Sequence, residues 1–217
     1  MRPLLVALTL LLLVPAAARA RVSSRNAVFV LVATTTTRAV SVAPDGSRAF
    51  VAAGITVSVI DLNSRLGAGS ILMKATPLAL AVSPDGNTVY AARKGAIETV
   101  DVPAMIRTGE RKLAGTPIAL VVTATRAVEV QQGGKVAILD LTTGRLVRRI
   151  NLEGAAGVAL DHHGRAWVSA TTPRKGKRKA ASRIVRIDPT SGGFSGSVAL
   201  GTDGGGGLER QRHDRRW

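Results

Sequence analysis

The sequence predicts an all-β protein made of consecutive four-stranded antiparallel units, and three observations support this prediction. A pattern recurs about every 40 residues along the chain, which indicates stacked supersecondary units. Within each unit the apolar runs are short and rich in Val, Ile and Ala. Turn residues separate these runs. Four short antiparallel strands in about 40 residues describe the blade of a β-propeller, in which neighbouring blades bury both faces of each sheet.

The recurrence is clearest in the first two units. The segment "SVAPDGSRAFVAA" from Ser41 aligns with "AVSPDGNTVYAAR" from Ala81, so that Gly46 and Gly86 lie 40 residues apart. One aspartate closes the third apolar run of each unit. These marker aspartates are Asp61, Asp101, Asp140 and Asp188, spaced 40, 39 and 48 residues apart. They predict about four blades, near residues 38–76, 77–116, 117–154 and 155–201.

The second unit shows how the elements follow from the residues. We expect its strands near residues 78–83, 88–92, 96–101 and 111–113. Pro84, Asp85 and Gly86 form the first turn, because proline presets φ, aspartate accepts backbone hydrogen bonds and glycine accepts positive φ. Gly95 serves the second turn. The marker aspartates are expected to cap the third turn of each unit rather than to act as acids.

The third and fourth units keep this order with local changes. In the third unit "LVVTATRAVEV" from Leu120 replaces the Pro-Asp-Gly signature, and "VAILDLTTG" from Val136 follows. The fourth unit reads "GVALDHHGRAWVSA" from Gly157. It then inserts a basic segment, residues 171–182, between its second and third strands. Such an insertion is expected on the propeller face that carries the connections between blades.

Two of these segments resemble a known family. "VSPDGNTVYAA" and "ITVSVIDLNS" are similar to the YVTN-type β-propeller repeats of secreted and surface-layer proteins, over roughly residues 26–201. The name-giving tetrapeptide itself is absent, and residues 50–53, 90–93 and 167–170 stand in its place. The resemblance implies a largely non-catalytic scaffold and brings no functional residues. A solenoid or a sandwich stays open as an alternative, since spacing alone does not establish radial closure.

The two ends of the chain differ from the repeats. Residues 1–20 predict a secretory signal peptide, with Arg2, an apolar run and the small-residue pattern around Arg19. We therefore expect a secreted or extracytoplasmic protein, in the periplasm or at the cell surface, and an uncleaved anchor is the alternative. Residues 202–217 predict an aberrant or disordered basic tail, because the pattern stops at Leu208. We expect a truncated seven-bladed propeller; a four-bladed ring with a disordered tail is the alternative.

Composition limits the chemistry. The chain has no cysteine, which excludes disulfides, thiolate metal sites and cysteine nucleophiles. Its formal charge of +16 becomes +14 without Arg2 and Arg19 of the predicted signal peptide. An excess of this size attracts anionic surfaces. An anionic polymer or a membrane or cell-envelope surface is therefore the expected partner, and nucleic acid is disfavoured by export. The sequence specifies no protein partner.

The basic insertion is the candidate contact for an anionic ligand. Its cations are Arg174, Lys175, Lys177, Arg178 and Lys179. A solvated insertion that only aids solubility is the alternative, because the segment has no aromatic residue on which a base or sugar could stack.

No catalytic residue, cofactor site or metal site is predicted. Asp161, His162 and His163 are adjacent in a turn, and adjacent residues rarely converge on one ion without distant partners. "GFSGS" from Gly193 lacks the spacing of a nucleophile elbow. Tyr90 and one tryptophan of a second strand, Trp167, are expected to pack between blades.

The sequence thus predicts a secreted, non-enzymatic β-propeller scaffold for binding or cell-surface interaction. One alternative is a propeller enzyme of the lyase or quinoprotein-like type, which would place a histidine or glutamate on an inner strand facing the channel. A non-functional fragment is another.

Overall fold

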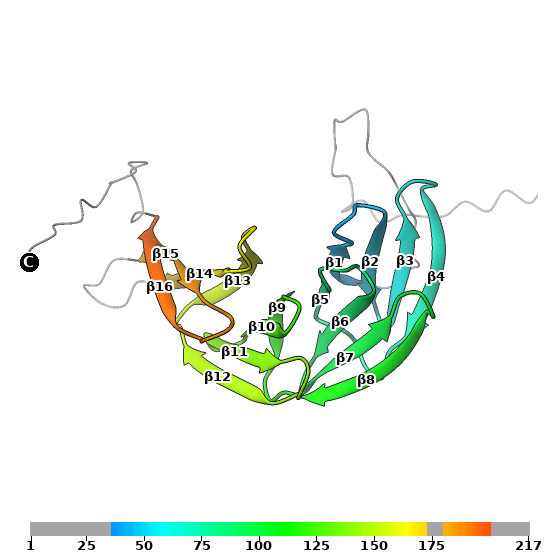
Figure 1. The fold of residues 1–217 in the computed structure, drawn as a ribbon. Helices are drawn as coiled ribbons and strands as arrows, with labels where there is room; N and C mark the ends of the chain where they lie inside the picture. The colour runs from blue at the N-terminus through cyan, green and yellow to red at the C-terminus, as the bar shows by residue number, and fades with distance from the viewer. Residues whose placement is uncertain (1–35, 173–179, 201–217) are drawn as a thin grey trace, which may run out of the picture.

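Each repeat unit folds into one four-stranded antiparallel sheet, which confirms the all-β prediction. The computed structural model describes residues 36–172 and 180–200 of the chain. Its four sheets follow one another around an open arc, with the first and fourth sheets at the two ends (Figure 1). In every sheet the spatial order of the strands equals their sequence order, so that only hairpins connect them.

The strands have the following bounds. The first sheet contains β1 (Thr37–Val42), β2 (Arg48–Ala53), β3 (Thr56–Asp61) and β4 (Leu66–Leu72). The second contains β5 (Ala79–Val82), β6 (Thr88–Arg93), β7 (Ala96–Asp101) and β8 (Ile106–Lys112). The third contains β9 (Pro117–Val122), β10 (Arg126–Gln131), β11 (Lys135–Asp140) and β12 (Leu146–Asn151). The fourth contains β13 (Ala155–Leu160), β14 (Ala166–Thr172), β15 (Ala181–Ile187) and β16 (Phe194–Ala199).

One predicted strand is longer than expected. We expected the outer strand of the second unit at residues 111–113, whereas β8 begins at Ile106 and pairs with β7 from Asp101 to Ala96. The added residues are mostly polar, because an outer strand leaves much of its side-chain surface in water. Apolar alternation therefore gives a weak signal for such a strand.

The core lies between consecutive sheets. Phe50 and Ala52 of β2 pack against Val89 and Ala91 of β6, between the first and second sheets. Two further clusters fill the spaces between the second and third sheets and between the third and fourth. The inner strands β1, β5, β9 and β13 lie side by side in this order. The middle sheets are thus buried on both faces, which explains their near-continuous runs of Val, Ile and Ala.

The turns use the expected chemistry. Gly46 and Gly86 have φ of 71° and 75°, values that suit glycine. The marker aspartates cap the third turns, as predicted: Asp61 Oδ1 accepts hydrogen bonds from the N–H groups of Asn63 and Ser64 at 2.9 and 2.7 Å. The same carboxylate-to-backbone bond recurs in the other three sheets.

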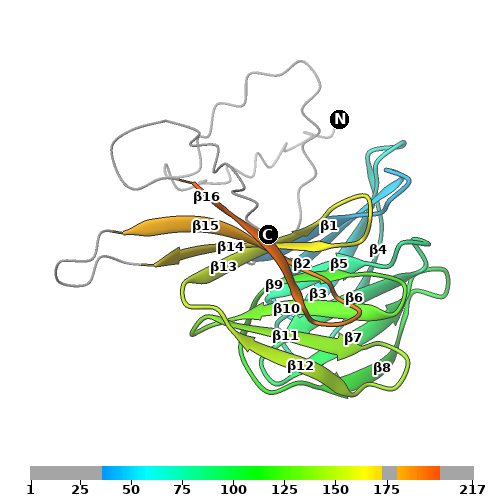
Figure 2. The same ribbon diagram turned by 60° about the vertical axis from the view of Figure 1, so that its left-hand side comes forward.

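The β14–β15 hairpin extends past its neighbours at the end where residues 173–179 join the two strands (Figure 2). The described ranges contain no helix long and apolar enough to cross a bilayer. The predicted signal peptide and the predicted basic tail lie outside the described residues.

Candidate functional site

The hairpin topology places the described lysines and the described aspartates on different faces of the molecule. Turns between second and third strands, and the connections between sheets, lie on one face, which we call the lysine face. All four lysines in the described ranges lie there: Lys74, Lys94, Lys112 and Lys135. The opposite face, the aspartate face, carries the remaining turns and every described aspartate. These are Asp45, Asp61, Asp85, Asp101, Asp140, Asp161 and Asp188.

The basic insertion joins β14 to β15, whose shared end belongs to the lysine face. Its five predicted contact residues lie outside the described ranges: Arg174, Lys175, Lys177, Arg178 and Lys179. Their role therefore stays a prediction. Arg183 and Arg149 add described cations near the same face, and Arg149 donates a hydrogen bond to the carbonyl of Ala114 at 3.3 Å.

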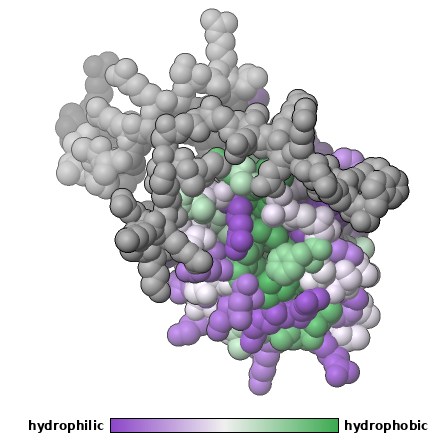
Figure 3. Space-filling model, turned by 90° about the vertical axis from the view of Figure 1, so that its left-hand side faces the viewer, coloured by the Kyte–Doolittle hydropathy of each residue, from purple (hydrophilic) through white to green (hydrophobic). Residues whose placement is uncertain are grey.

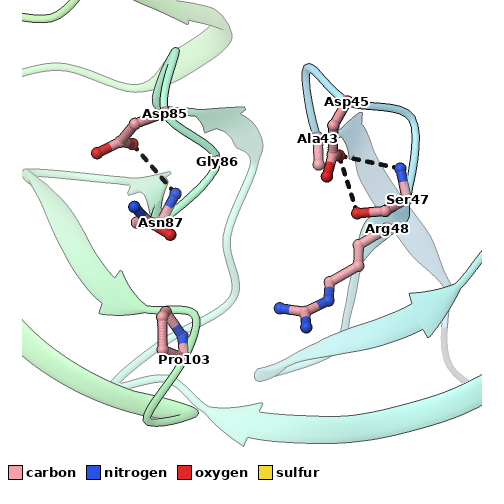
Figure 4. A pocket seen from close by; sticks show the side chains of 8 residues that line it. All are labelled: Ala43, Asp45, Ser47, Arg48, Asp85, Gly86, Asn87 and Pro103. Atoms are coloured by element: carbon pink, nitrogen blue, oxygen red, sulfur yellow. Dashed lines mark hydrogen bonds between the residues drawn. The ribbon is translucent and has the colours of Figure 1, made fainter.

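The aspartate face has a shallow pocket of about 280 Å³ between the first turns of the first and second sheets (Figure 4). Asp45 and Asp85 stand on the two turns, and Arg48 extends from β2 toward the space between them. Hydrogen bonds from the backbone N–H and the hydroxyl of Ser47 lower the pKa of Asp45. A bond from the Ser83 hydroxyl is the main cause that lowers the pKa of Asp85. Both carboxylates are thus ionised and already engaged by their own turns.

A network of ion pairs lies between the first and second sheets, near the lysine face. The fully buried carboxylate of Glu98 accepts hydrogen bonds from Arg93 Nε at 2.7 Å and from Arg107 Nη1 at 3.1 Å. Glu110 pairs with Arg93 Nη2 at 2.8 Å and with Lys74 Nζ at 2.5 Å. The hydrogen bond that Arg93 donates to Glu98 raises the pKa of Arg93. Both carboxylates of this network are thus paired, and its three cations leave one excess positive charge.

A second buried carboxyl group lies between the second and third sheets. Glu129 of β10 is only 1% exposed and accepts a hydrogen bond from Gln131 Nε2 at 2.7 Å. Burial raises the pKa of Glu129 to about 7, although Gln131 and the charge of Arg149 oppose the shift. No nucleophilic side chain in the described ranges is hydrogen-bonded to it. Glu129 is therefore a buried carboxyl group whose ionisation is opposed by its surroundings.

Sequence reasoning did not single out these two glutamates. The available signal was an acid inside an apolar strand, in "AIETVD" and "RAVEVQ". A buried acid needs a partner. The arginine partners of Glu98 come from other strands, whereas the partner of Glu129 is Gln131, two residues later on the same strand.

The turn at Asp161 is closed by its own hydrogen bonds. Asp161 Oδ1 accepts from the N–H groups of His163 and Arg165, at 2.9 and 3.0 Å. Oδ2 accepts from Arg165 Nε at 2.8 Å and from Trp167 Nε1 at 3.0 Å. Partial burial opposes ionisation, yet these bonds lower the pKa of Asp161. The described part of the chain holds no group of three acidic, histidine or cysteine side chains that could bind a metal ion.

Tyr90 and Trp167 have different environments. Tyr90 packs against the cluster between the second and third sheets, as predicted. Trp167 does not pack between described sheets. Its neighbours Ala166 and Val168 face the third sheet, so the indole lies on the opposite face of the fourth sheet. There the Arg186 guanidinium lies 5.6 Å from the indole centroid, over the ring.

Comparison with known proteins identifies the fold alone. No family model and no curated protein matches the chain. Among solved structures it is similar to hydrazine synthase of Kuenenia stuttgartiensis, with a TM-score of 0.64 and 20% identity over 75% of this chain and 49% of that one. It is also similar to U3-55K, with a TM-score of 0.59 and 14% identity over 77% of this chain and 53% of that one.

The WD40 repeats of RRP9 give a TM-score of 0.59 and 15% identity, over 79% of this chain and 54% of that one. The chain thus spans about half the length of the solved chains that it matches. The sheets have the arrangement found in β-propeller and WD40-type folds.

Proposed function

We propose that this chain is a secreted, non-enzymatic β-propeller scaffold of the YVTN type that binds an anionic polymer or cell-envelope surface through its lysine face. The observation that carries the proposal is the separation of lysines from aspartates: the four described lysines lie on one face and the seven described aspartates on the other. The three remaining lysines of the chain belong to the insertion between β14 and β15.

The charged side chains of the two faces also differ in their hydrogen bonds and ion pairs. Aspartates on the aspartate face accept hydrogen bonds from their own turns. On the lysine face, Lys94, Lys112 and Lys135 form no ion pair within the described ranges. A set of solvated cations on one face raises the local concentration of an anionic partner, and salt weakens the effect.

Binding to dextran sulfate and to phosphatidylglycerol vesicles, measured against a salt series with the full chain, tests this proposal. The triple variant Lys94→Glu, Lys112→Glu and Lys135→Glu should weaken binding roughly tenfold or more at low salt. Preference for the polymer or for the vesicle identifies the kind of surface.

A matched variant reverses the same number of charges elsewhere: Arg48→Glu, Arg145→Glu and Arg148→Glu. It should retain most of the binding, because these exposed side chains lie away from the lysine face. Equal loss in both triple variants would attribute binding to net charge, and no binding of the parent chain to either probe would reject the proposal.

A further inference from the structure

We propose that two copies of this chain associate head to tail, with the fourth sheet of each packed against the first sheet of the other, to close a ring of eight sheets. The starting point is the position of Trp167. Its cross-strand partner is Arg186. The residues at the same position of the other sheets are Phe50, Tyr90 and Val128. Those three side chains pack against the following sheet.

The third strand of the fourth sheet repeats this relationship. Four residues before the marker aspartates stand Val57, Ile97, Val136 and Ile184. The first three are 0% exposed, because the next sheet covers them. Ile184 is only partly buried, on the same face as Trp167. The fourth sheet therefore carries a face built to pack against another sheet.

Hydrophobic side chains of β16 are exposed beside this face. Phe194, Val198 and the adjoining Leu200 are 56%, 47% and 55% exposed. Figure 3 shows the side of the molecule that carries β16, with hydrophobic side chains lying among hydrophilic ones. Val198 pairs with Ile184 and so shares its face.

The first sheet carries the complementary face. Val40 and Val42 of β1 are 58% and 51% exposed. The corresponding residues of the other sheets pack against the preceding sheet: Leu80, Val82, Leu120, Val122, Val158 and Leu160. Ala49, Val51 and Ile60, which are only 6 to 7% exposed, form a further apolar cluster on this sheet at the positions that Val89, Ala91 and Val100 use to contact the first sheet.

Side-chain sizes also match across the proposed contact. In the third turns, the fourth residue after the marker aspartate has positive φ: Arg65, Met105, Gly144 and Gly192. Where this residue is large, the preceding outer strand has glycine: a Cβ on Gly69 would lie 2.7 Å from Met105 Cε. Where it is glycine, the outer strand has a long side chain: a Cβ on Gly192 would lie 2.6 Å from Arg148 Cδ.

Arg65 in the first sheet and Gly196 in the fourth occupy these paired positions at the open ends. The rule of one small and one large residue is therefore satisfied between the two ends of the arc. This rule holds at two of the three closed interfaces; at the interface of the second and third sheets the paired residues are Gly109 and Gly144, and the side chain of Arg111 fills the space instead.

A second copy is the occupant that these observations specify. One chain carries both halves of the interface, and contact between different surfaces of identical chains closes a ring when the rotation allows. The four sheets form an open arc (Figure 1) and align with about half of each solved propeller chain. Two copies joined at both ends would bury both apolar faces.

One pair at the junction is unfavourable. Arg65 corresponds to Met105 of the second sheet, and Arg186 corresponds to Val59 of the first. Met105 and Val59 pack in one cluster, so Arg65 and Arg186 would lie close together at the new junction. Two cations repel, so association should strengthen with added salt. Arg65→Glu should replace this repulsion by attraction and tighten association.

Sedimentation velocity of the full chain at several concentrations tests the proposal. We expect a species of about twice the 22.5 kDa chain mass. Val40→Lys and Val198→Lys should each weaken association roughly tenfold or more, since each places a charge in an apolar contact. Val147→Lys is the control, because Val147 is 42% exposed on β12 of the third sheet.

Mixing the Val40→Lys and Val198→Lys chains gives the sharpest result. The Val40→Lys chain keeps its fourth sheet unaltered, and the Val198→Lys chain keeps its first sheet unaltered. These two faces can still form one junction, so a two-chain species should return. Recovery on mixing and tighter association of Arg65→Glu support the proposal.

Three outcomes would overturn it: a parent chain that stays monomeric; a series of species larger than two chains; or variants that associate like the parent. Thermal unfolding of each variant separates a folded monomer from a misfolded chain.

Discussion

Arg93 bridges two carboxylates that stand directly opposite each other on neighbouring strands, and its Nε lies 2.7 Å from Glu98 Oε1. Its Nη2 lies 2.8 Å from the facing Glu110. Like charges at directly opposed positions destabilise a sheet. Here the guanidinium group of Arg93 offsets this repulsion, because its planar N–H donors reach both carboxylates.

Arg93→Gln should therefore destabilise the fold by about 2 to 3 kcal/mol, because it leaves buried Glu98 with Arg107 as its remaining cation. Urea unfolding followed by circular dichroism measures the loss. Arg107→Gln is the control and should cost less, since the Arg107 side chain is 33% exposed. Equal costs for the two variants would contradict the bridging role of Arg93.

Glu129 predicts a dependence of stability on pH. Its pKa is about 7 in the folded chain and 4.5 in an unperturbed glutamate. The folded state therefore binds the proton more tightly, so stability falls as pH rises from about 4.5 to about 7 and is then level. Glu129→Gln should remove this part of the slope and stabilise the fold by up to about 3 kcal/mol at pH 8.

Urea unfolding of parent and variant at pH 5 and pH 8 isolates this contribution, because the other titrating groups are common to both chains. If the difference in unfolding free energy between the two chains is the same at both pH values, Glu129 does not titrate as proposed.

Much of the fold followed from local residues. The marker aspartates and the glycines of the first turns act within a few residues of themselves, so their spacing alone located the hairpins. The start of β8 was missed because its polar residues gave no apolar alternation. The bridging role of Arg93 was missed for a related reason: it depends on the register of β6, β7 and β8, and the polar residues of β8 gave no signal that Glu110 would face Glu98.

The candidate site was predictable only in part. The excess of positive charge was visible in the sequence, but the separation of lysines from aspartates needed the strand directions. Trp167 was expected between blades because Tyr90 stands at the same position. The structure instead places the indole on the face of the fourth sheet that no other described sheet covers. A repeat pattern identifies which face a residue belongs to without stating whether a neighbour covers it.

Substitution by alanine should lower the free energy of unfolding far more at Gly154 than at Gly46. Both have positive φ, 74° and 71°, so alanine costs about 1 kcal/mol at either position through the backbone. A Cβ at Gly154 would also lie 1.9 Å from the carbonyl oxygen of Thr171, whereas nothing lies within 4 Å of one at Gly46. Gly154→Ala should therefore cost about 3 kcal/mol or more by urea unfolding. Similar losses for the two variants would contradict the close approach at Gly154.

The hydrogen bond from Trp167 to Asp161 predicts a change in fluorescence. The chain has two tryptophans, so Trp217→Phe leaves Trp167 as the single emitter. In that background Asp161→Ala should shift the emission to longer wavelength, because the indole loses its carboxylate partner and the turn that positions it. Asp188→Ala is the matched control: Asp188 accepts the same kind of turn hydrogen bonds and forms none with Trp167. Equal shifts in the two variants would mean that loosening of the fourth sheet, rather than loss of the Asp161 partner, alters the environment of the indole.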